Sequence, residues 1–304
     1  MEKLIDRPYY IHLIRPFIGK NVIKVLTGQR RVGKSCILKQ LASRIVQEDA
    51  DANIISINKE LEDFAFIHTH EDLSKYVNAQ LRQGVANYLF IDEVQEINDF
   101  EVTLRSLQAS EACDIYITGS NDKMFSSELS THLSGRYVEF KIQSLSYDEF
   151  LLFHHLEPSN QSLRNFLLYG GMPYLTHLPL ERDVVFEYLQ NVYNTILLKD
   201  VVKREGIRNV EFLETLALYT ADNVGNLFSA NNISKYLKSQ HVNTSPTQVI
   251  NYLRAMQNAY LIQKVRRLDV NGLRMFEIGD KYYFEDLGLR NCRLSSSVQQ
   301  DINK

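Results

Sequence analysis

The chain has 304 residues, of which 44% are hydrophobic and 23% are charged, an ordinary balance for a globular protein that needs no disulfides or metals to build its core. Its formal net charge of −3 excludes a globally basic protein, so any surface for nucleic acid must be local. Three scattered cysteines and no apolar run of membrane or signal-peptide type predict a soluble, cytoplasmic protein with no membrane partner.

Strands and helices alternate through the first half of the chain. Apolar, β-branched runs predict the strands, and apolar residues at helical spacing predict the helices between them. Nearly continuous apolar strands alternating with helices are typical of a parallel sheet covered on both faces. The predicted strands are Asn21–Gly28, Ala52–Asn58, Asn87–Val94, Cys113–Ser120 and Arg136–Ile142, and the predicted helices include Lys34–Gln47 and His70–Gly84.

The pattern changes after about residue 145. Helical periodicity continues to about residue 225 with no clear strand, and no flexible linker separates this part from the sheet domain. We therefore expect a sheet domain over 1–145, a helical lid subdomain over 146–225 and a further domain over 226–304.

The last domain carries the order of elements of a winged helix-turn-helix. A short helix is expected at Asn231–Gln240, and a second one begins at Pro246 with Ser245 as its N-cap. Two strand-like segments then flank Asn271–Gly272, a strong hairpin signal. Helix, turn, helix and hairpin in succession predict the winged helix.

The stretch GQRRVGKS, residues 28–35, matches the phosphate-binding pattern G-x-x-x-x-G-K-[ST] in full. The glycines let backbone N–H groups surround an anion at a helix N-terminus. Lys34 would reach the β- and γ-phosphates, and Ser35 would offer its hydroxyl to Mg²⁺. A glycine-rich turn beside a surface lysine is the weaker alternative. The predicted nucleotide-binding residues are Gly28, Gln29, Arg30, Arg31, Val32, Gly33, Lys34, Ser35 and Cys36.

An acidic pair follows the apolar run YLFI. Asp92 at the end of a strand is placed to hold Mg²⁺ together with Ser35, and Glu93 to polarise a water for attack on the γ-phosphate. Two solvated acids at a strand end are the alternative. The Asp-Glu pair favours an ATPase over a GTPase, so we expect ATP and Mg²⁺ as the ligands.

A polar turn ends the next predicted strand, IYITGSN. Ser120 or Asn121 would read the γ-phosphate or orient the water, and the sequence does not choose between them. An ordinary polar turn after a buried strand is the alternative.

These motifs, with LSGRYVEFKIQSLSYDEF, YGGMPYL and DKYYFEDLGLRN, resemble the prokaryotic AAA+-type ATPases of AAA family 14 over essentially the whole chain. The resemblance implies an α/β P-loop NTPase fold with strand order 5-1-4-3-2, a helical subdomain and a winged helix. It gives Lys34 and Ser35 the phosphate and Mg²⁺ contacts, and Asp92 and Glu93 the metal and water-activating roles. Members of the family usually continue into a nuclease-like domain, so we expect this chain to be a truncated or naturally short member.

Three arginines are singled out by the same resemblance. Arg30 and Arg31 are typical of the family but are not needed to cradle phosphate. We expect them to point away from the nucleotide, toward the acidic strand ends or the helical and winged modules. Arg136 is a candidate γ-phosphate contact in cis or from a neighbouring subunit, with a buried salt bridge as an equal alternative. The oligomeric state stays open.

The predicted winged helix is locally basic. Between residues 231 and 281 there are eight basic and three acidic residues. Such a module could contact the phosphates of double-stranded DNA, or it could pack on the ATPase core as a nucleotide-responsive lid. Two functions follow: an ATPase whose turnover moves the winged helix, or a slow ATP-gated switch that binds DNA or a protein partner. The predicted DNA contacts are Arg254, Lys264, Arg266 and Arg267.

Overall fold

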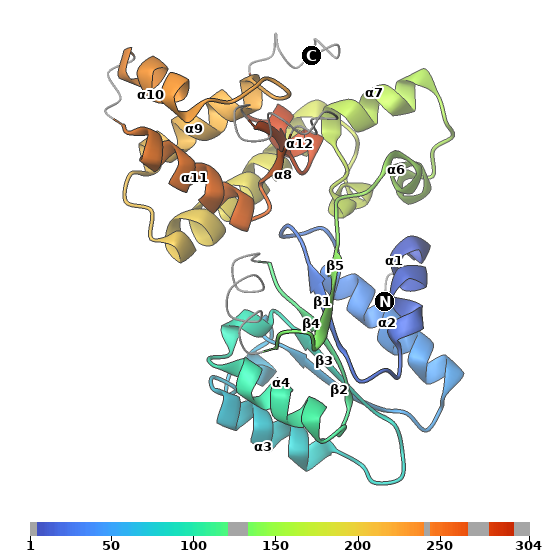
Figure 1. The fold of residues 1–304 in the computed structure, drawn as a ribbon. Helices are drawn as coiled ribbons and strands as arrows, with labels where there is room; N and C mark the ends of the chain where they lie inside the picture. The colour runs from blue at the N-terminus through green and yellow to red at the C-terminus, as the bar shows by residue number, and fades with distance from the viewer. Residues whose placement is uncertain (1–4, 121–132, 240–243, 267–279, 295–304) are drawn as a thin grey trace, which may run out of the picture. The chain divides into compact units, whose positions relative to one another are not determined.

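The computed structural model describes residues 5–120, 133–239, 244–266 and 280–294 (Figure 1). The chain divides into two compact units. The first comprises Met1–Gly28 and Val32–Gln143, and the second comprises Gln29–Arg31 and Ser144–Lys304. Three residues of the predicted phosphate loop thus group with the second unit. The division into three domains stays a prediction.

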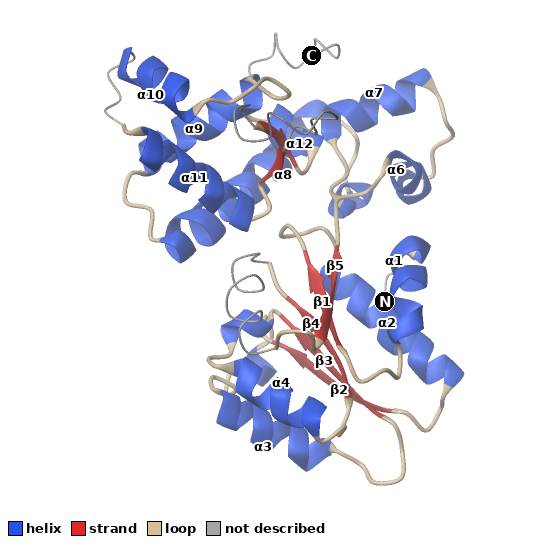
Figure 2. Ribbon diagram, in the orientation of Figure 1, coloured by secondary structure: helices blue, strands red, loops and turns tan. Residues whose placement is uncertain are grey.

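A five-stranded parallel sheet forms the centre of the first unit (Figure 2). Each strand coincides with a predicted apolar run, and the predicted order 5-1-4-3-2 is confirmed. Neighbouring strands are parallel, so their carboxyl ends meet at one edge of the sheet. In spatial order the strands are β2 (Asn53–Asn58), β3 (Asn87–Asp92), β4 (Asp114–Thr118), β1 (Ile23–Thr27) and β5 (Tyr137–Lys141).

Helices cover both faces of this sheet (Figure 2). On one face, α3 (His70–Gln80) and α4 (Phe100–Ala109) pack apolar side chains against alternate residues of the strands. On the other face lies α2 (Lys34–Glu48), against which α1 (Pro8–Ile14) packs. The helix that was expected to reach Gly84 is shorter, because Leu81 already takes an extended backbone conformation.

The second unit is helical in its first part, as the periodicity predicts. Helix α8 (Arg182–Thr195) continues directly into a π-helical segment, Ile196–Lys203. The other helices of this part are α6 (Tyr147–His154), α7 (Asn160–Tyr169) and α9 (Val210–Asp222). Short 3₁₀ turns in the two units lie at Arg15–Phe17, Glu62–Phe64, Val94–Glu96 and Pro173–His177.

Two helices and an antiparallel strand pair follow in the predicted order. The side-chain oxygen of Ser245 accepts a hydrogen bond from the backbone N–H of Gln248, so it caps α11 as expected. The predicted turn Asn271–Gly272 lies outside the described residues, and the winged helix stays a prediction. The elements are α10 (Ala230–Ser239), α11 (Pro246–Asn258), β6 (Ile262–Val265), β7 (Lys281–Phe284) and a final α12 (Leu287–Asn291).

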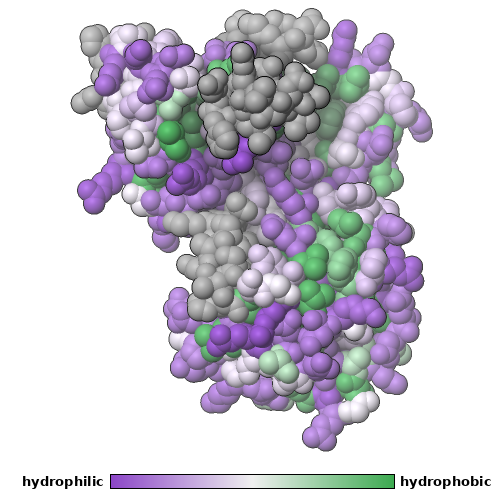
Figure 3. Space-filling model, in the orientation of Figure 1, coloured by the Kyte–Doolittle hydropathy of each residue, from purple (hydrophilic) through white to green (hydrophobic). Residues whose placement is uncertain are grey.

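Hydrophilic residues predominate on the face of the molecule drawn in Figure 3, with apolar side chains gathered in small groups between them. None of the helices within the described ranges is long and apolar enough to cross a membrane.

A half-buried histidine makes part of the second unit sensitive to acid. Burial lowers the pKa of His154 to about 4, with a smaller contribution from His155, and the His154 ring lies 4.3 Å from that of Phe150. The unfolded chain titrates this group near 6.5, so it binds more protons than the folded protein between the two values. The stability that this group contributes is therefore present above about pH 6.5 and is lost as the pH falls through about 4.

Between pH 6.5 and pH 4, we expect the melting temperature of the His154→Leu variant to fall less than that of the wild type. Thermal unfolding followed by circular dichroism measures the difference. His155→Asn is the matched control, because His155 is exposed and asparagine tolerates its left-handed backbone conformation. Parallel pH profiles of the wild type and His154→Leu would contradict the assignment.

Candidate functional site

The predicted phosphate loop joins β1 to α2. Strand β1 ends at Thr27, Gly28 follows it, and α2 begins at Lys34. Gly28 and Gly33 have φ angles of 136° and 94°, which glycine adopts without steric cost. A Cβ on Gly28 would lie 2.1 Å from the carbonyl oxygen of Ile142, so a side chain has no room there. The backbone angle and the lack of space for a side chain therefore explain why the sequence pattern has glycine at position 28.

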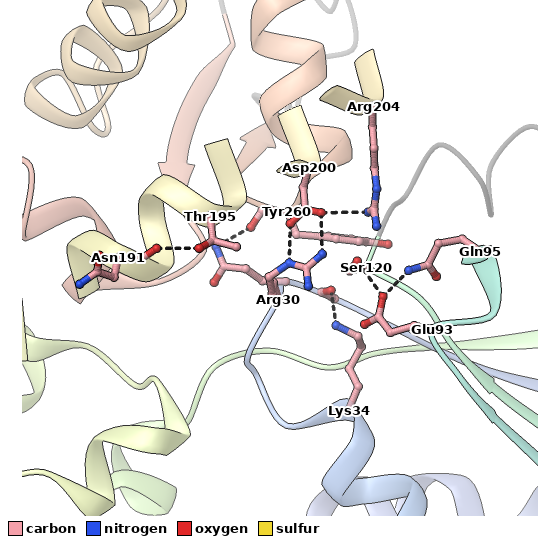
Figure 4. Close-up of polar contacts among 12 residues, drawn as sticks. Arg30, Lys34, Glu93, Gln95, Ser120, Asn191, Thr195, Asp200, Arg204 and Tyr260 are labelled. Atoms are coloured by element: carbon pink, nitrogen blue, oxygen red, sulfur yellow. Dashed lines mark hydrogen bonds and ion pairs between the residues drawn. The ribbon is translucent and has the colours of Figure 1, made fainter. Parts of the chain in front are cut away.

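The ammonium group of Lys34 turns back onto this loop (Figure 4). Its Nζ donates a hydrogen bond of 2.9 Å to the carbonyl oxygen of Gly28, and the residue is 4% exposed. The N-terminus of α2 adds the positive end of a helix dipole at the same place. Ser35, half-buried, is the next residue of the helix. Such groups could hold the phosphates of a nucleotide and one ligand position of a metal ion.

Asp92 is the last residue of β3 and is buried at the carboxyl edge of the sheet. One of its carboxylate oxygens accepts a hydrogen bond of 2.5 Å from the hydroxyl of Thr118, the last residue of β4. The backbone N–H of Glu93 donates to the same hydroxyl at 2.9 Å. Thr118 thus joins two strand ends, a role that the sequence does not reveal because threonine is common in strands.

Glu93 has φ 55° and ψ 54°, a left-handed conformation that is uncommon for a residue with a side chain. Residues in such conformations cluster at functional sites. Its carboxylate accepts hydrogen bonds from the amide of Gln95 and, at 3.3 Å, from the hydroxyl of Ser120 (Figure 4). Of the two polar residues expected near the acids, Ser120 lies there, and Asn121 is outside the described residues. Gln95 was missed, although it stands only two positions after Glu93.

The residues present fit a bound Mg²⁺. Helix α2 packs against β3, which brings the helix that carries Ser35 to the strand that ends in Asp92. A hydroxyl and a carboxylate are hard oxygen donors of the kind that Mg²⁺ takes from proteins, with nucleotide oxygens and water as further ligands.

Two side chains of the loop are engaged within the second unit. The amide of Gln29 donates to the carbonyl oxygen of Tyr260 at 2.8 Å, and the guanidinium of Arg30 pairs with Asp200 (Figure 4). Arg31 is exposed and has φ 71°. Cys36, on the first turn of α2, is also exposed.

The other flank of the loop is held from the N-terminal segment. The guanidinium of Arg7, 3% exposed, donates from Nη1 to the carbonyl oxygens of Val32 and Gln143, each at 3.0 Å. The Arg7 guanidinium also lies over the ring of Tyr10 at 4.6 Å. Val32 belongs to the loop, so Arg7 fixes one of its peptide groups. An arginine far upstream of the motif gives no sequence signal for this contact.

We expect Arg7→Met to weaken nucleotide binding by about tenfold, which is the loss of roughly one charge-assisted hydrogen bond. Methionine preserves most of the buried aliphatic length and removes the donors to Val32. Titration calorimetry with Mg·ADP measures the change. Arg15→Met is the control, because the Arg15 side chain is 69% exposed and pairs only with exposed Glu48 among the ion pairs of the described residues. Equal affinities of the two variants would exclude a role for Arg7 in positioning the loop.

Arg136 lies at the wrong edge of the sheet to reach a phosphate of its own chain. Ile23 at the start of β1 is in register with Tyr137, so Arg136 stands beside the amino end of β1. The phosphate loop follows the carboxyl end of that strand. The expected cis contact is therefore wrong, because parallel pairing separates the two sites by the length of a strand. The alternative of a buried salt bridge is also wrong, since Arg136 is exposed. A contact across subunits stays a prediction.

The predicted DNA contacts are only partly within the described residues. Arg254 on α11 and Arg266 after β6 are exposed, and Arg267 lies outside the described ranges. Lys264 pairs with Asp280 at 2.6 Å, so its charge is largely balanced within the protein.

Known proteins match both parts of the chain. Residues 20–151 match the AAA domain model (family 14), and residues 160–300 match a domain of unknown function (DUF8612). An uncharacterized protein of Haemophilus influenzae is 32% identical over 311 residues, covering 100% of this chain and 77% of that protein. The uncharacterized protein MJ1544 of Methanocaldococcus jannaschii is 30% identical over 274 residues, covering 86% and 59%.

Among solved structures, Cdc6p from Pyrobaculum aerophilum covers 99% of this chain and 96% of its own, at 12% identity and a TM-score of 0.42. This chain belongs to AAA family 14 of the prokaryotic AAA+ ATPases.

Proposed function

We propose that this chain binds Mg·ATP at residues 28–35 and hydrolyses it to ADP and phosphate. One observation carries the proposal. The glycine loop at the N-terminus of α2 and the acidic pair at the end of β3 lie at the same carboxyl edge of one sheet. Neither element alone would do, because a bound triphosphate needs a cradle and its hydrolysis needs a base.

Each residue has a defined part in this reaction. Lys34 exchanges the Gly28 carbonyl for the β- and γ-phosphates, and Ser35 and Asp92 hold Mg²⁺, which when bound neutralises charge on the phosphates. Glu93 accepts the proton of the attacking water. Gln95 and Ser120 donate hydrogen bonds to the Glu93 carboxylate and so orient it.

Steady-state release of phosphate from ATP tests the proposal. The wild type is expected to turn over ATP with Mg²⁺ and to lose this activity in excess EDTA. The Lys34→Ala variant sets the background. A wild type that is no faster than Lys34→Ala would end the proposal.

A second candidate function is an ATP-gated switch that acts on double-stranded DNA through the predicted winged helix. It is favoured by the exposed arginines Arg254 and Arg266 and by the engagement of Gln29 and Arg30 within the second unit, which ties the loop to that unit. Fluorescence anisotropy with a labelled DNA duplex, with and without Mg·ATP, tests it. Affinity that responds neither to nucleotide nor to Arg254→Ala/Arg266→Ala would exclude DNA and favour a protein partner or a lid.

A further inference from the structure

Arg30 makes a two-pronged ion pair with a buried carboxylate (Figure 4). Its Nε and Nη2 donate to the two carboxylate oxygens of Asp200, each at 2.9 Å. The side chain of Asp200 is 1% exposed and that of Arg30 is 18% exposed. A planar, bidentate pair fixes direction as well as distance. Arg30 is therefore held in one place within the second unit.

Asp200 stands in an unusual stretch of helix. It lies in the π-helical segment Ile196–Lys203, and π turns are rare and often occur at functional sites. Arg204, four residues on, places its Nη1 3.1 Å from the same carboxylate. Asp200 thus pairs with two arginines, which balance a carboxylate that would be costly to bury alone.

A second contact ties the loop to the same region. The buried amide of Gln29 donates to the carbonyl oxygen of Tyr260, just after α11. The amide of Asn258 at the end of α11 donates to Glu205 at 3.1 Å. The residues that receive Gln29 and Arg30 therefore belong to one connected structure made from the π-helical region and the end of α11.

We infer that Asp200 is a positioning residue for nucleotide binding, which acts through Arg30 and holds the phosphate loop in its binding conformation. Arg30 lies between Gly28 and Gly33, so fixing its side chain restrains the flexible backbone that must surround the phosphates. Restraint in the bound conformation lowers the entropy lost on binding. The inference rests on the proposed binding of Mg·ATP and adds a residue that positions the loop for it.

Linkage makes this effect reciprocal. If the pair of Arg30 and Asp200 strengthens nucleotide binding by some factor, bound nucleotide stabilises the pair by the same factor. Amide hydrogen exchange over residues 196–205 should therefore slow when the loop is occupied. A residue that only supports the fold would not show this dependence on nucleotide.

Titration calorimetry with Mg·ADP on the full chain tests the inference. Asp200→Asn and Arg30→Gln are each expected to raise Kd by a factor of about 5 to 150, the usual span of coupling between sites. The double variant should be no weaker than the weaker single variant, because both changes remove one contact. Lys199→Gln is the matched control, since Lys199 is exposed and adjacent to Asp200, and it should keep the Kd of the wild type.

Hydrogen exchange on the same proteins gives the second readout. Saturating Mg·ADP should slow exchange over 196–205 in the wild type and in Lys199→Gln, but not in Asp200→Asn. If Asp200→Asn does not fold, Arg30→Lys replaces it, because lysine keeps the charge and loses the bidentate geometry. Arg30→Lys is then expected to raise Kd less than Arg30→Gln and to weaken the nucleotide effect over 196–205.

Two results would overturn the inference. If Arg30→Gln raises Kd while Asp200→Asn leaves it unchanged or lowers it, Arg30 contacts the phosphates itself and Asp200 does not position it. If Mg·ADP slows exchange over residues 196–205 as much in Asp200→Asn or Arg30→Lys as in the wild type, the nucleotide effect does not pass through the pair of Arg30 and Asp200. If the wild type binds Mg·ADP no better than Lys34→Ala, the proposed function itself is wrong, and the role of Asp200 does not arise.

Discussion

Glutamine in place of Glu93 is expected to lower kcat for ATP hydrolysis by about 10²–10⁴-fold, the usual contribution of a general base. The amide keeps the size of the side chain but cannot accept a proton from water. Lys34 and Ser35 are untouched, so the affinity for Mg·ATP should stay within about twofold of the wild type. Steady-state phosphate release measures kcat, and calorimetry with a slowly hydrolysed ATP analogue measures binding.

The control for Glu93→Gln is Glu96→Gln. Glu96 is an exposed acid on the 3₁₀ turn that directly follows Glu93, and the same change of charge there should leave kcat unaltered. Equal kcat values for Glu93→Gln and the wild type would remove Glu93 from the mechanism. If Glu93→Gln lowers the affinity for the nucleotide and leaves kcat unchanged, the carboxylate helps to bind the nucleotide and does not activate the water.

Alanine in place of Gly28 is expected to destabilise the first unit by about 3 kcal/mol, from a steric clash and an unfavourable backbone angle together. The added Cβ would lie 2.1 Å from the backbone oxygen of Ile142, and a backbone oxygen cannot swing away as a flexible side chain would. The φ angle of 136° also belongs to a region that side chains disfavour. Urea unfolding followed by circular dichroism measures the loss.

Gly84→Ala separates the two causes. Gly84 also has a positive φ, 79°, but within the described ranges no atom beyond its own chain neighbours lies within 4 Å of where its Cβ would be. We expect about 1 kcal/mol from the backbone angle alone at this position. If both variants lose the same amount, the contact with Ile142 contributes nothing, and the loop is looser than the structure describes.

The sequence alone was sufficient for the sheet and for the centre of the site. Strand order came from a family resemblance resting on local motifs, and each strand is an apolar run that stands out over five or six residues. The predicted phosphate loop is a contiguous motif of eight residues, and the sequence correctly places it between β1 and α2 with glycines at positive φ. The acidic pair is likewise adjacent in sequence, and its strand positions it.

The tertiary structure decided which distant residues contact the residues of the proposed site. Thr118 holds Asp92 from another strand, Arg7 holds Val32 from the N-terminal segment, and Asp200 holds Arg30 from 170 residues away. Parallel pairing of β5 with β1 also places Arg136 at the amino edge of the sheet, opposite the carboxyl edge where the loop and the acids lie.

A sequence motif consists of residues that lie next to one another in the chain and act together. The sequence of this protein was therefore sufficient to predict its motifs. Buried hydrogen bonds and ion pairs between distant segments depend on how the chain packs. One arginine or aspartate among many carries no mark of the partner that folding will bring to it. For that reason, the positions of the proposed phosphate loop and its acids in the fold could be predicted, and the side chains that contact them from distant segments could not.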